Sequence, residues 1–283
     1  MPSPRTLLVL GRVSNLPTVW SNCLAGWWLG GGGNVVKLPF LFLGVTLLYV
    51  GGMFLNDAFD EQFDRQHRQE RPIPSGRISA GLVWRWGFVL LAVGELPLFG
   101  CGVSTGVLGI ALALCILLYD ALHKALTFSP LLMGACRFLV YLIAASSGET
   151  GVGGWAIWSG LALSVYVAGL SFIARGESLR GPLQFWPVAL LAAPVLLALF
   201  LNVGTYREPA LLLSLVLTLW TLRCLRTIFW TGVPNVGRTV SGLLAGIVLV
   251  DWIAAVQTPR ELGCAFIALF LSALLAQRFV PAT

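Results

Sequence analysis

The sequence predicts an all-α protein, a single domain over residues 1–283 that forms a polytopic membrane bundle of nine to ten transmembrane helices. Two features of the composition support this fold class. Hydrophobic residues make up 57% of the chain and charged residues only 11%, and the mean hydropathy is +0.85. No soluble core of this size needs so much apolar sequence. The third observation is that the apolar residues fall into runs of about 20 residues, the length that crosses a bilayer core.

Ten apolar runs are the predicted spans. In chain order they cover 6–30, 38–60, 80–100, 103–122, 130–147, 155–174, 184–202, 209–230, 239–256 and 261–279. The first run holds Arg12, Asn15 and Pro17 and is long, unlike the short apolar region of a secretory signal, so we interpret it as a span. In the ninth run, small residues around Gly242 and Gly246 indicate a helix-packing face.

The distribution of Lys and Arg predicts the orientation of the bundle. With the N-terminus in the cytoplasm, the outer side holds only Lys37, Arg207 and Arg260 of the eighteen Lys and Arg residues. Basic residues accumulate on the cytoplasmic side of membrane proteins. The net charge of +6 is therefore explained by topology, and we expect no nucleic-acid partner. The outer loops are short, whereas the inner connections 61–79, 119–129 and 175–182 are polar, so we expect an active site that faces the cytoplasm.

The most polar stretch of the chain follows the second apolar run. Five of the twelve acidic residues lie between Asp57 and Glu70. On a helix, Asn56, Asp60, Asp64 and Asp57 point to roughly 0°, 40°, 80° and 100°, so one face carries three carboxylates and an amide. Like charges at this spacing destabilise a helix unless a cation lies among them.

Oxygen ligands of this kind suit Mg²⁺, which keeps waters and shares phosphate oxygens. A solvated cytoplasmic loop is the alternative interpretation of the acidic run. The common helix face and the adjoining membrane helix favour a metal–phosphate site. The residues 71–77, Arg-Pro-Ile-Pro-Ser-Gly-Arg, cannot continue the helix and turn the chain back. Their guanidinium groups add bidentate donors near the carboxylates, which together describe a diphosphate pocket.

This region resembles the UbiA superfamily of intramembrane prenyltransferases, through N-D-x-x-D-x-x-x-D at 56–64 and R-P-I-P-S-G-R-I-S at 71–79. The resemblance implies a UbiA-type helical bundle in a bacterial inner membrane, which binds a polyprenyl diphosphate with its tail among the membrane helices. It implies Mg²⁺-dependent transfer of the prenyl group to an aromatic or hydroxyl acceptor. Asn56, Asp57, Asp60 and Asp64 are then the expected metal ligands and catalytic residues.

The resemblance extends at lower specificity over most of the chain. Lys124 is the fifth expected catalytic residue, and the remaining expected substrate contacts are Asn15, Arg65, Arg71, Tyr119 and Arg137. The stretches 12–20 and 119–137 look closest to the UbiA-like member of the bacterial ebo cluster.

Two departures from the family pattern bear on these expectations. The family places a second aspartate-rich motif after the sixth helix, whereas this chain reads Ala-Arg-Gly-Glu-Ser-Leu-Arg at 174–180. We expect Arg175 to contact the diphosphate and Glu177 to contribute to substrate and metal binding, with a full second Mg²⁺ site in doubt. The tenth apolar run is the other departure, because the family usually has nine helices. A non-catalytic protein that binds or transports an isoprenoid stays open as the alternative function, with a secondary transporter ranked last.

Overall fold

The computed structural model describes residues 2–178, 185–202, 204–230 and 235–281, and the side chains of residues 176–178 lie outside that description. Within these ranges every regular element is a helix. The elements are α1 (Pro4–Leu10), η1 (Val13–Asn15), α2 (Leu16–Leu29), α3 (Lys37–Phe59), α4 (Glu61–His67), α5 (Ala80–Cys101), α6 (Val103–Leu122), α7 (Ser129–Ser146), α8 (Gly154–Ser178), α9 (Trp186–Leu190), α10 (Ala193–Leu201), η2 (Gly204–Tyr206), α11 (Arg207–Phe229), α12 (Val236–Ala254) and α13 (Arg260–Ala276).

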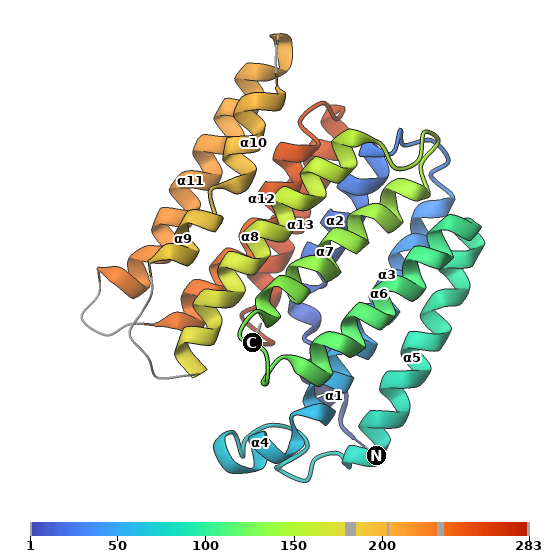
Figure 1. Cartoon of the computed structure of the whole chain (residues 1–283), viewed down its shortest axis with the longest axis vertical. Helices are drawn as coiled ribbons and strands as arrows, with labels where there is room; N and C mark the ends of the chain where they lie inside the picture. Colours follow the sequence, from blue (N-terminus) through green and yellow to red (C-terminus); the bar gives the residue numbers. More distant parts are fainter. Residues whose placement is uncertain (1, 179–184, 203, 231–234, 282–283) are drawn as a thin grey trace.

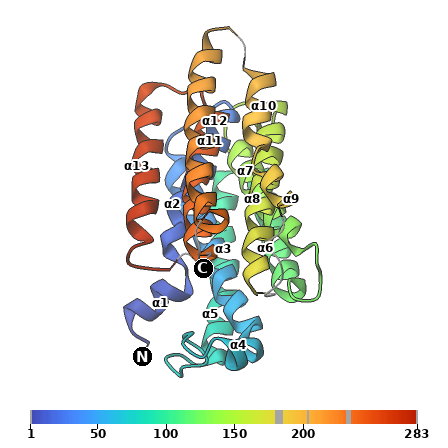
Figure 2. The ribbon, with the colours of Figure 1, turned by 90° about the vertical axis from the view of Figure 1, so that its left-hand side faces the viewer.

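The long helices run alongside one another between two ends of an elongated bundle (Figures 1 and 2). Neighbours along the chain pack as antiparallel pairs, and α2 and α12 come together from opposite ends of the sequence. The N-terminus, α4 and the α6–α7 connection lie at the same end of the bundle (Figure 1). The polar connections that follow α3 and α6 therefore meet at one end, as the topology prediction requires.

The prediction of one continuous helix over 6–30 is wrong. The chain forms α1, then η1, then α2, because Arg12 adopts a left-handed backbone conformation with φ 43° and ψ 46°. A non-glycine residue at positive φ interrupts a right-handed helix. Pro17 occupies the first turn of α2, where its missing N–H costs nothing. As a consequence Arg12 projects from a turn at the end of the bundle.

The predicted segment 184–202 is likewise divided, into α9 and α10, with Pro194 in the first turn of the second helix. Seven described helices are long and apolar enough to cross a membrane: α3, α5, α6, α7, α8, α11 and α12. Two others are shorter, α2 with 14 residues and α13 with 17. The chain is a multi-pass membrane protein, but the predicted count of nine to ten spans is not confirmed.

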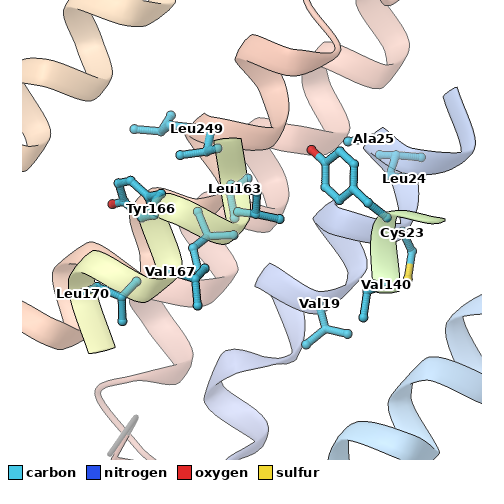
Figure 3. Packing of buried hydrophobic residues seen from close by; sticks show 14 of the residues in the cluster. Val19, Cys23, Leu24, Ala25, Val140, Leu163, Tyr166, Val167, Leu170 and Leu249 are labelled. Atoms are coloured by element: carbon cyan, nitrogen blue, oxygen red, sulfur yellow. The ribbon is translucent and has the colours of Figure 1, made fainter. Parts of the chain in front are cut away.

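The core lies where α2, α7, α8 and α12 meet (Figure 3). Val19 and Cys23 on α2 and Leu163 and Val167 on α8 are buried there. Gly26 permits the close approach of α2 to α7, since a Cβ atom at this position would lie 2.7 Å from the Ala144 Cβ. The predicted small-residue face of α12 is confirmed at Gly246, where a Cβ would lie 2.8 Å from the Tyr166 hydroxyl.

Candidate active site

The four oxygen-bearing residues of the first motif gather where α3 gives way to α4. Asn56 and Asp57 end α3, Asp60 is the residue between the two helices, and Asp64 lies in α4. The backbone N–H of Asp64 donates to the carbonyl of Asp60 over 2.9 Å, so the helical hydrogen bonding continues through the junction. All four are buried, with 6%, 4%, 7% and 1% exposure. The sequence interpretation as a solvated loop is therefore wrong for these side chains.

Two arginines hold Asp57. Arg71 donates from Nη1 to Asp57 Oδ1 over 2.7 Å, and Arg12 donates from Nη2 to the same oxygen over 3.1 Å. Arg12 also reaches Asn56 Oδ1 over 3.2 Å. The chain turns at Arg68, which ends α4 with φ −143° and ψ 59°, and the backbone N–H of Arg71 donates to the Arg68 carbonyl over 3.1 Å. This turn brings Arg71 back to the carboxylates. The single carboxylate of Asp57 thus neutralises only part of the charge of Arg12 and Arg71. The N–H donors of these two arginines that do not bond to Asp57 or Asn56 can bind a further anion.

Asp60 is held by cations from the other side. Lys124 Nζ lies 2.6 Å and His123 Nε2 lies 3.1 Å from Asp60 Oδ1. Burial raises the pKa of Asp60, but the neighbouring His123 and Lys124 outweigh it and lower the pKa below its usual value. Burial lowers the pKa of His123, and the bond to Asp60 reverses this and raises it. Tyr119 stacks on His123 with ring centroids 5.2 Å apart, which fixes the plane of the imidazole.

Within this cluster, two buried carboxylate oxygens have neither a hydrogen-bond partner nor an ion-pair partner among the described residues. One is Asp64 Oδ1, and the other is Asp120 Oδ2. The second oxygen of Asp120 accepts from Asn56 Nδ2 over 3.0 Å. Burial raises the pKa of Asp64, Arg71 opposes this, and the charges of Asp60 and Asp57 raise it further. A buried acceptor without a donor is costly, and a bound cation would supply a partner for these oxygens.

These donors suit Mg²⁺ in kind. Carboxylate and amide oxygens are the ligands that this ion prefers, through one or two carboxylates together with substrate phosphates and water. Within the described ranges, no group of three or more His, Cys, Asp or Glu side chains stands close enough to form a metal cage by itself. The residues therefore fit an ion that arrives with a phosphate group, and Asn56, Asp57, Asp60 and Asp64 are the ones that would hold it.

An apolar cavity of about 70 Å³ opens on the membrane side of this cluster. Its polar wall consists of Tyr49, Tyr119, Asp120 and Arg137, and the remaining lining is mainly apolar, including Val19, Val45, Leu112, Ile116 and Val140. A charged head at the carboxylates and an apolar tail in this cavity would lie next to each other. The site thus has the amphiphilic form that a lipid-like substrate requires.

Arg137 lies deeper than the other cations of the site. Its Nη1 donates to Asn22 Oδ1 over 2.6 Å and its Nη2 to Thr18 Oγ1 over 3.1 Å. Asn22 in turn donates to Asp251 Oδ2 over 2.7 Å. Ionisable groups inside a membrane protein pair in this way because isolated charges there are expensive. Arg137 is therefore held in a fixed position. It lines the apolar cavity and does not lie at the carboxylate cluster, where the diphosphate is expected.

Several expected site residues lie elsewhere. Arg65 is exposed and pairs with Glu61 one helical turn away, at 2.7 Å, and its expected substrate contact stays a prediction. Arg175 bonds to the α6–α7 connection, at Leu126 O over 2.6 Å. Asn15 is buried at the start of α2 and hydrogen bonds with Tyr49, which lines the cavity. The Glu177 side chain falls outside the described residues.

The expected site residues included neither Arg12 nor Asp120, and His123 was considered as a phosphate contact beside Lys124 without being assigned to the site. Arg12 was assigned to a membrane span, and only the positive φ that breaks this span brings it to Asp57. Asp120 and His123 stand four and one residues before Lys124. One turn of helix puts positions 120 and 124 on the same face, which was the available signal.

The model of the UbiA prenyltransferase family matches residues 15–230. The chain belongs to this family. The matched range includes the two polar segments that form the cluster, 56–79 and 119–129. Family membership therefore agrees with the all-helical architecture and the buried carboxylates.

Curated relatives align with parts of the chain. Digeranylgeranylglyceryl phosphate synthase from Methanosarcina mazei is 34% identical over 50% of this chain and 53% of its own length. The enzyme of the same name from Sulfolobus acidocaldarius is 34% identical over 42% of each. Protoheme IX farnesyltransferase from Macrococcus caseolyticus is 31% identical over 27% of this chain and 26% of its own length. The chain thus spans about half or less of the length of these relatives.

Solved structures share the fold. The apo structure of a UbiA homologue from Aeropyrum pernix K1 superposes with a TM-score of 0.69 and 18% identity, over 88% of this chain and 98% of that one. A structure concerned with digeranylgeranylglyceryl phosphate synthase in membranes gives a TM-score of 0.58 and 18% identity, over 95% and 97%. At this identity the likeness establishes the fold alone.

Proposed function

We propose that this protein is a Mg²⁺-dependent prenyltransferase that uses a polyprenyl diphosphate. The observation that carries the proposal is the buried cluster of Asp57, Asp60 and Asp64, which is bordered by cations. Asp120, which accepts a hydrogen bond from Asn56, lines an apolar cavity beside this cluster. The cluster would receive the diphosphate, and the cavity would receive the start of the tail. A cavity of about 70 Å³ is too small for a whole prenyl chain, so binding must widen the space among α2, α3, α6 and α7.

Each side chain has a definite task in this reaction. Arg12, Arg71 and Lys124 would bind the diphosphate oxygens and stabilise the negative charge that grows as the bond between C1 and oxygen breaks. Asp57 and Asp60 hold these cations in place beforehand. When bound, Mg²⁺ would supply further charge neutralisation at the leaving group. The electron pair leaves with the diphosphate oxygen, and the acceptor forms the new bond to C1 and releases a proton.

The apolar lining serves the second half of the reaction. Tyr119 and the aliphatic side chains around it would exclude water from the allylic cation. The names of the relatives point to prenyl groups of farnesyl or geranylgeranyl size, and the acceptor would be an aromatic ring or a hydroxyl group. The Lys and Arg distribution supports a cluster that faces the cytoplasm, and the bacterial inner membrane stays an expectation from the family resemblance. The kinship with the ebo cluster stays a prediction, since the relatives named above do not confirm it.

The test is a direct assay with purified protein in lipid nanodiscs. Radiolabelled farnesyl and geranylgeranyl diphosphates would be supplied with a panel of aromatic and hydroxyl-bearing acceptors. We expect a labelled lipid product that depends on Mg²⁺ and is lost in Asp57→Asn and Asp60→Asn variants that remain folded.

The same assay separates the alternative function. A protein that only binds or transports isoprenoids would retain the labelled diphosphate without forming a product or releasing diphosphate. Full turnover by Asp60→Asn, or turnover in excess EDTA, would contradict the proposed role of the cluster.

A further inference from the structure

Arg175, near the end of α8, donates hydrogen bonds to the connection between α6 and α7. Arg175 Nη1 lies 2.6 Å from Leu126 O and 2.7 Å from Ser129 Oγ, with longer contacts of 3.3 Å to His123 O and 3.4 Å to Thr127 O. One guanidinium nitrogen carries two hydrogens, so the two short contacts are its principal hydrogen bonds. A single side chain from α8 therefore fastens residues near both ends of this connection.

The fastened connection is the one that supplies cations to the active site. Ser129 Oγ donates to the carbonyl of His123 over 3.0 Å. The two residues that Arg175 contacts, Leu126 and Ser129, therefore both belong to the connection that starts at His123. His123 and Lys124 stand on that segment, and both contact Asp60. Lys124 also lies 4.2 Å from the Phe63 ring centroid of α4. Arg175 is thus linked to Asp60 through Ser129 and His123, by contacts that the structure shows at each step.

Lys124 is not fixed by burial. Its side chain is 40% exposed, and a long cationic side chain loses considerable rotamer entropy when it is held in one place. The position of its backbone therefore decides how often the ammonium group stands at Asp60. A backbone segment of a few residues without such a fastening would sample many arrangements.

We infer that Arg175 is a positioning residue, which acts through the α6–α7 connection to keep His123 and Lys124 beside Asp60. The inference rests on the proposed function for what these cations bind. This role differs from the expected diphosphate contact, and it is the one that the hydrogen bonds from Arg175 Nη1 to Leu126 and Ser129 support. The end of α8 would thus contribute to the site by holding another loop.

The experiment uses the full-length protein in nanodiscs with Mg²⁺ and geranylgeranyl thiolodiphosphate, a donor analogue that resists ionisation. Binding is measured by titration calorimetry for wild type, Arg175→Ala, Lys124→Ala and the double variant. Charge-assisted bonds of this kind lead us to expect roughly tenfold weaker binding in each single variant. In the double variant the loss should stay near that of Lys124→Ala alone, because Arg175 acts through Lys124.

Hydrogen exchange at residues 122–129 gives a readout that needs no ligand. Arg175→Ala should speed exchange there, and Arg175→Lys should restore part of the protection because one ammonium nitrogen can reach two acceptors. Arg223→Ala is the matched control, an arginine of α11 that packs on Trp220, and it should change neither readout.

Unchanged exchange in Arg175→Ala would overturn the fastening itself. Faster exchange with unchanged analogue binding, or binding losses that add fully in the double variant, would overturn the positioning role. If the wild-type protein fails to bind the analogue at all, the proposed function fails, while the exchange measurement still decides whether the contact holds the connection in place.

Discussion

The buried carboxylate of Asp251 offers the clearest energetic prediction. It is 0% exposed and accepts hydrogen bonds from Ser21 Oγ over 2.5 Å, Asn22 Nδ2 over 2.7 Å and Tyr141 OH over 2.7 Å. Side-chain hydrogen bonds within membrane proteins contribute on average about 0.6 and at most about 1.7 kcal/mol each. Three bonds lost together amount to about 2–5 kcal/mol, so Asp251→Ala should lower the free energy of unfolding by that amount.

The assay is steric trapping in bicelles, which measures unfolding of a membrane protein without extracting it. Asp251→Asn should lose less than Asp251→Ala, since its remaining carbonyl oxygen can still accept from two donors. Glu95→Ala is the control, because both Glu95 carboxylate oxygens lack a hydrogen-bond partner among the described residues. An Asp251→Ala protein within about 0.5 kcal/mol of wild type, which is the usual scatter for neutral substitutions, would refute the reasoning. So would an equal loss in the control.

Three further predictions concern the site and its orientation. Asp64→Asn should lower prenyl transfer by at least about 100-fold and weaken Mg²⁺ dependence, because a carboxylate ligand is lost; unchanged Mg²⁺ titration would exclude it as a ligand. Arg12→Ala should lower transfer roughly 10- to 100-fold by removing a charge-assisted bond, whereas the exposed Arg5→Ala should not; equal effects would contradict a specific role. Cysteines at Ser75 and Asn34 should be labelled from the cytoplasmic and outer sides respectively, and the reverse pattern would invert the topology.

The sequence was most informative where a single helix carries the pattern. Asn56, Asp57, Asp60 and Asp64 share a face because the helical period places them there, and the structure keeps that relation through the α3–α4 junction. The return of Arg71 was predicted from the prolines and the glycine that follow it, whereas the structure ends α4 earlier, at Arg68. Local chemistry therefore predicted the centre of the site.

The spacing of residues in the sequence did not predict the contacts between distant segments. Arg12 meets Asp57 only because its own backbone turns left-handed, a conformation that arginine rarely adopts and that tertiary packing must impose. Arg175 was expected to contact the diphosphate, and nothing in the sequence indicated that its Nη1 donates to the Leu126 carbonyl some fifty residues earlier. Arg65, adjacent to a motif residue, points one turn away to Glu61. For Arg12 and Arg175 the partner was set by packing rather than by spacing, whereas Arg65 and Glu61 form an i,i+4 pair that helical spacing alone predicts.

The short helices α2 and α13 have a consequence for the surrounding lipid. With 14 and 17 residues they rise roughly 21 and 26 Å, against about 30 Å for a bilayer core. They contact each other, but α2 is largely buried in the core, so it is α13 on one flank of the bundle (Figure 2) that presents its short length to lipid. Thinning of the bilayer there would cost a fraction of a kcal/mol per ångström. The protein should accordingly concentrate in membranes with short acyl chains, and lengthening those chains should compress this flank before any other.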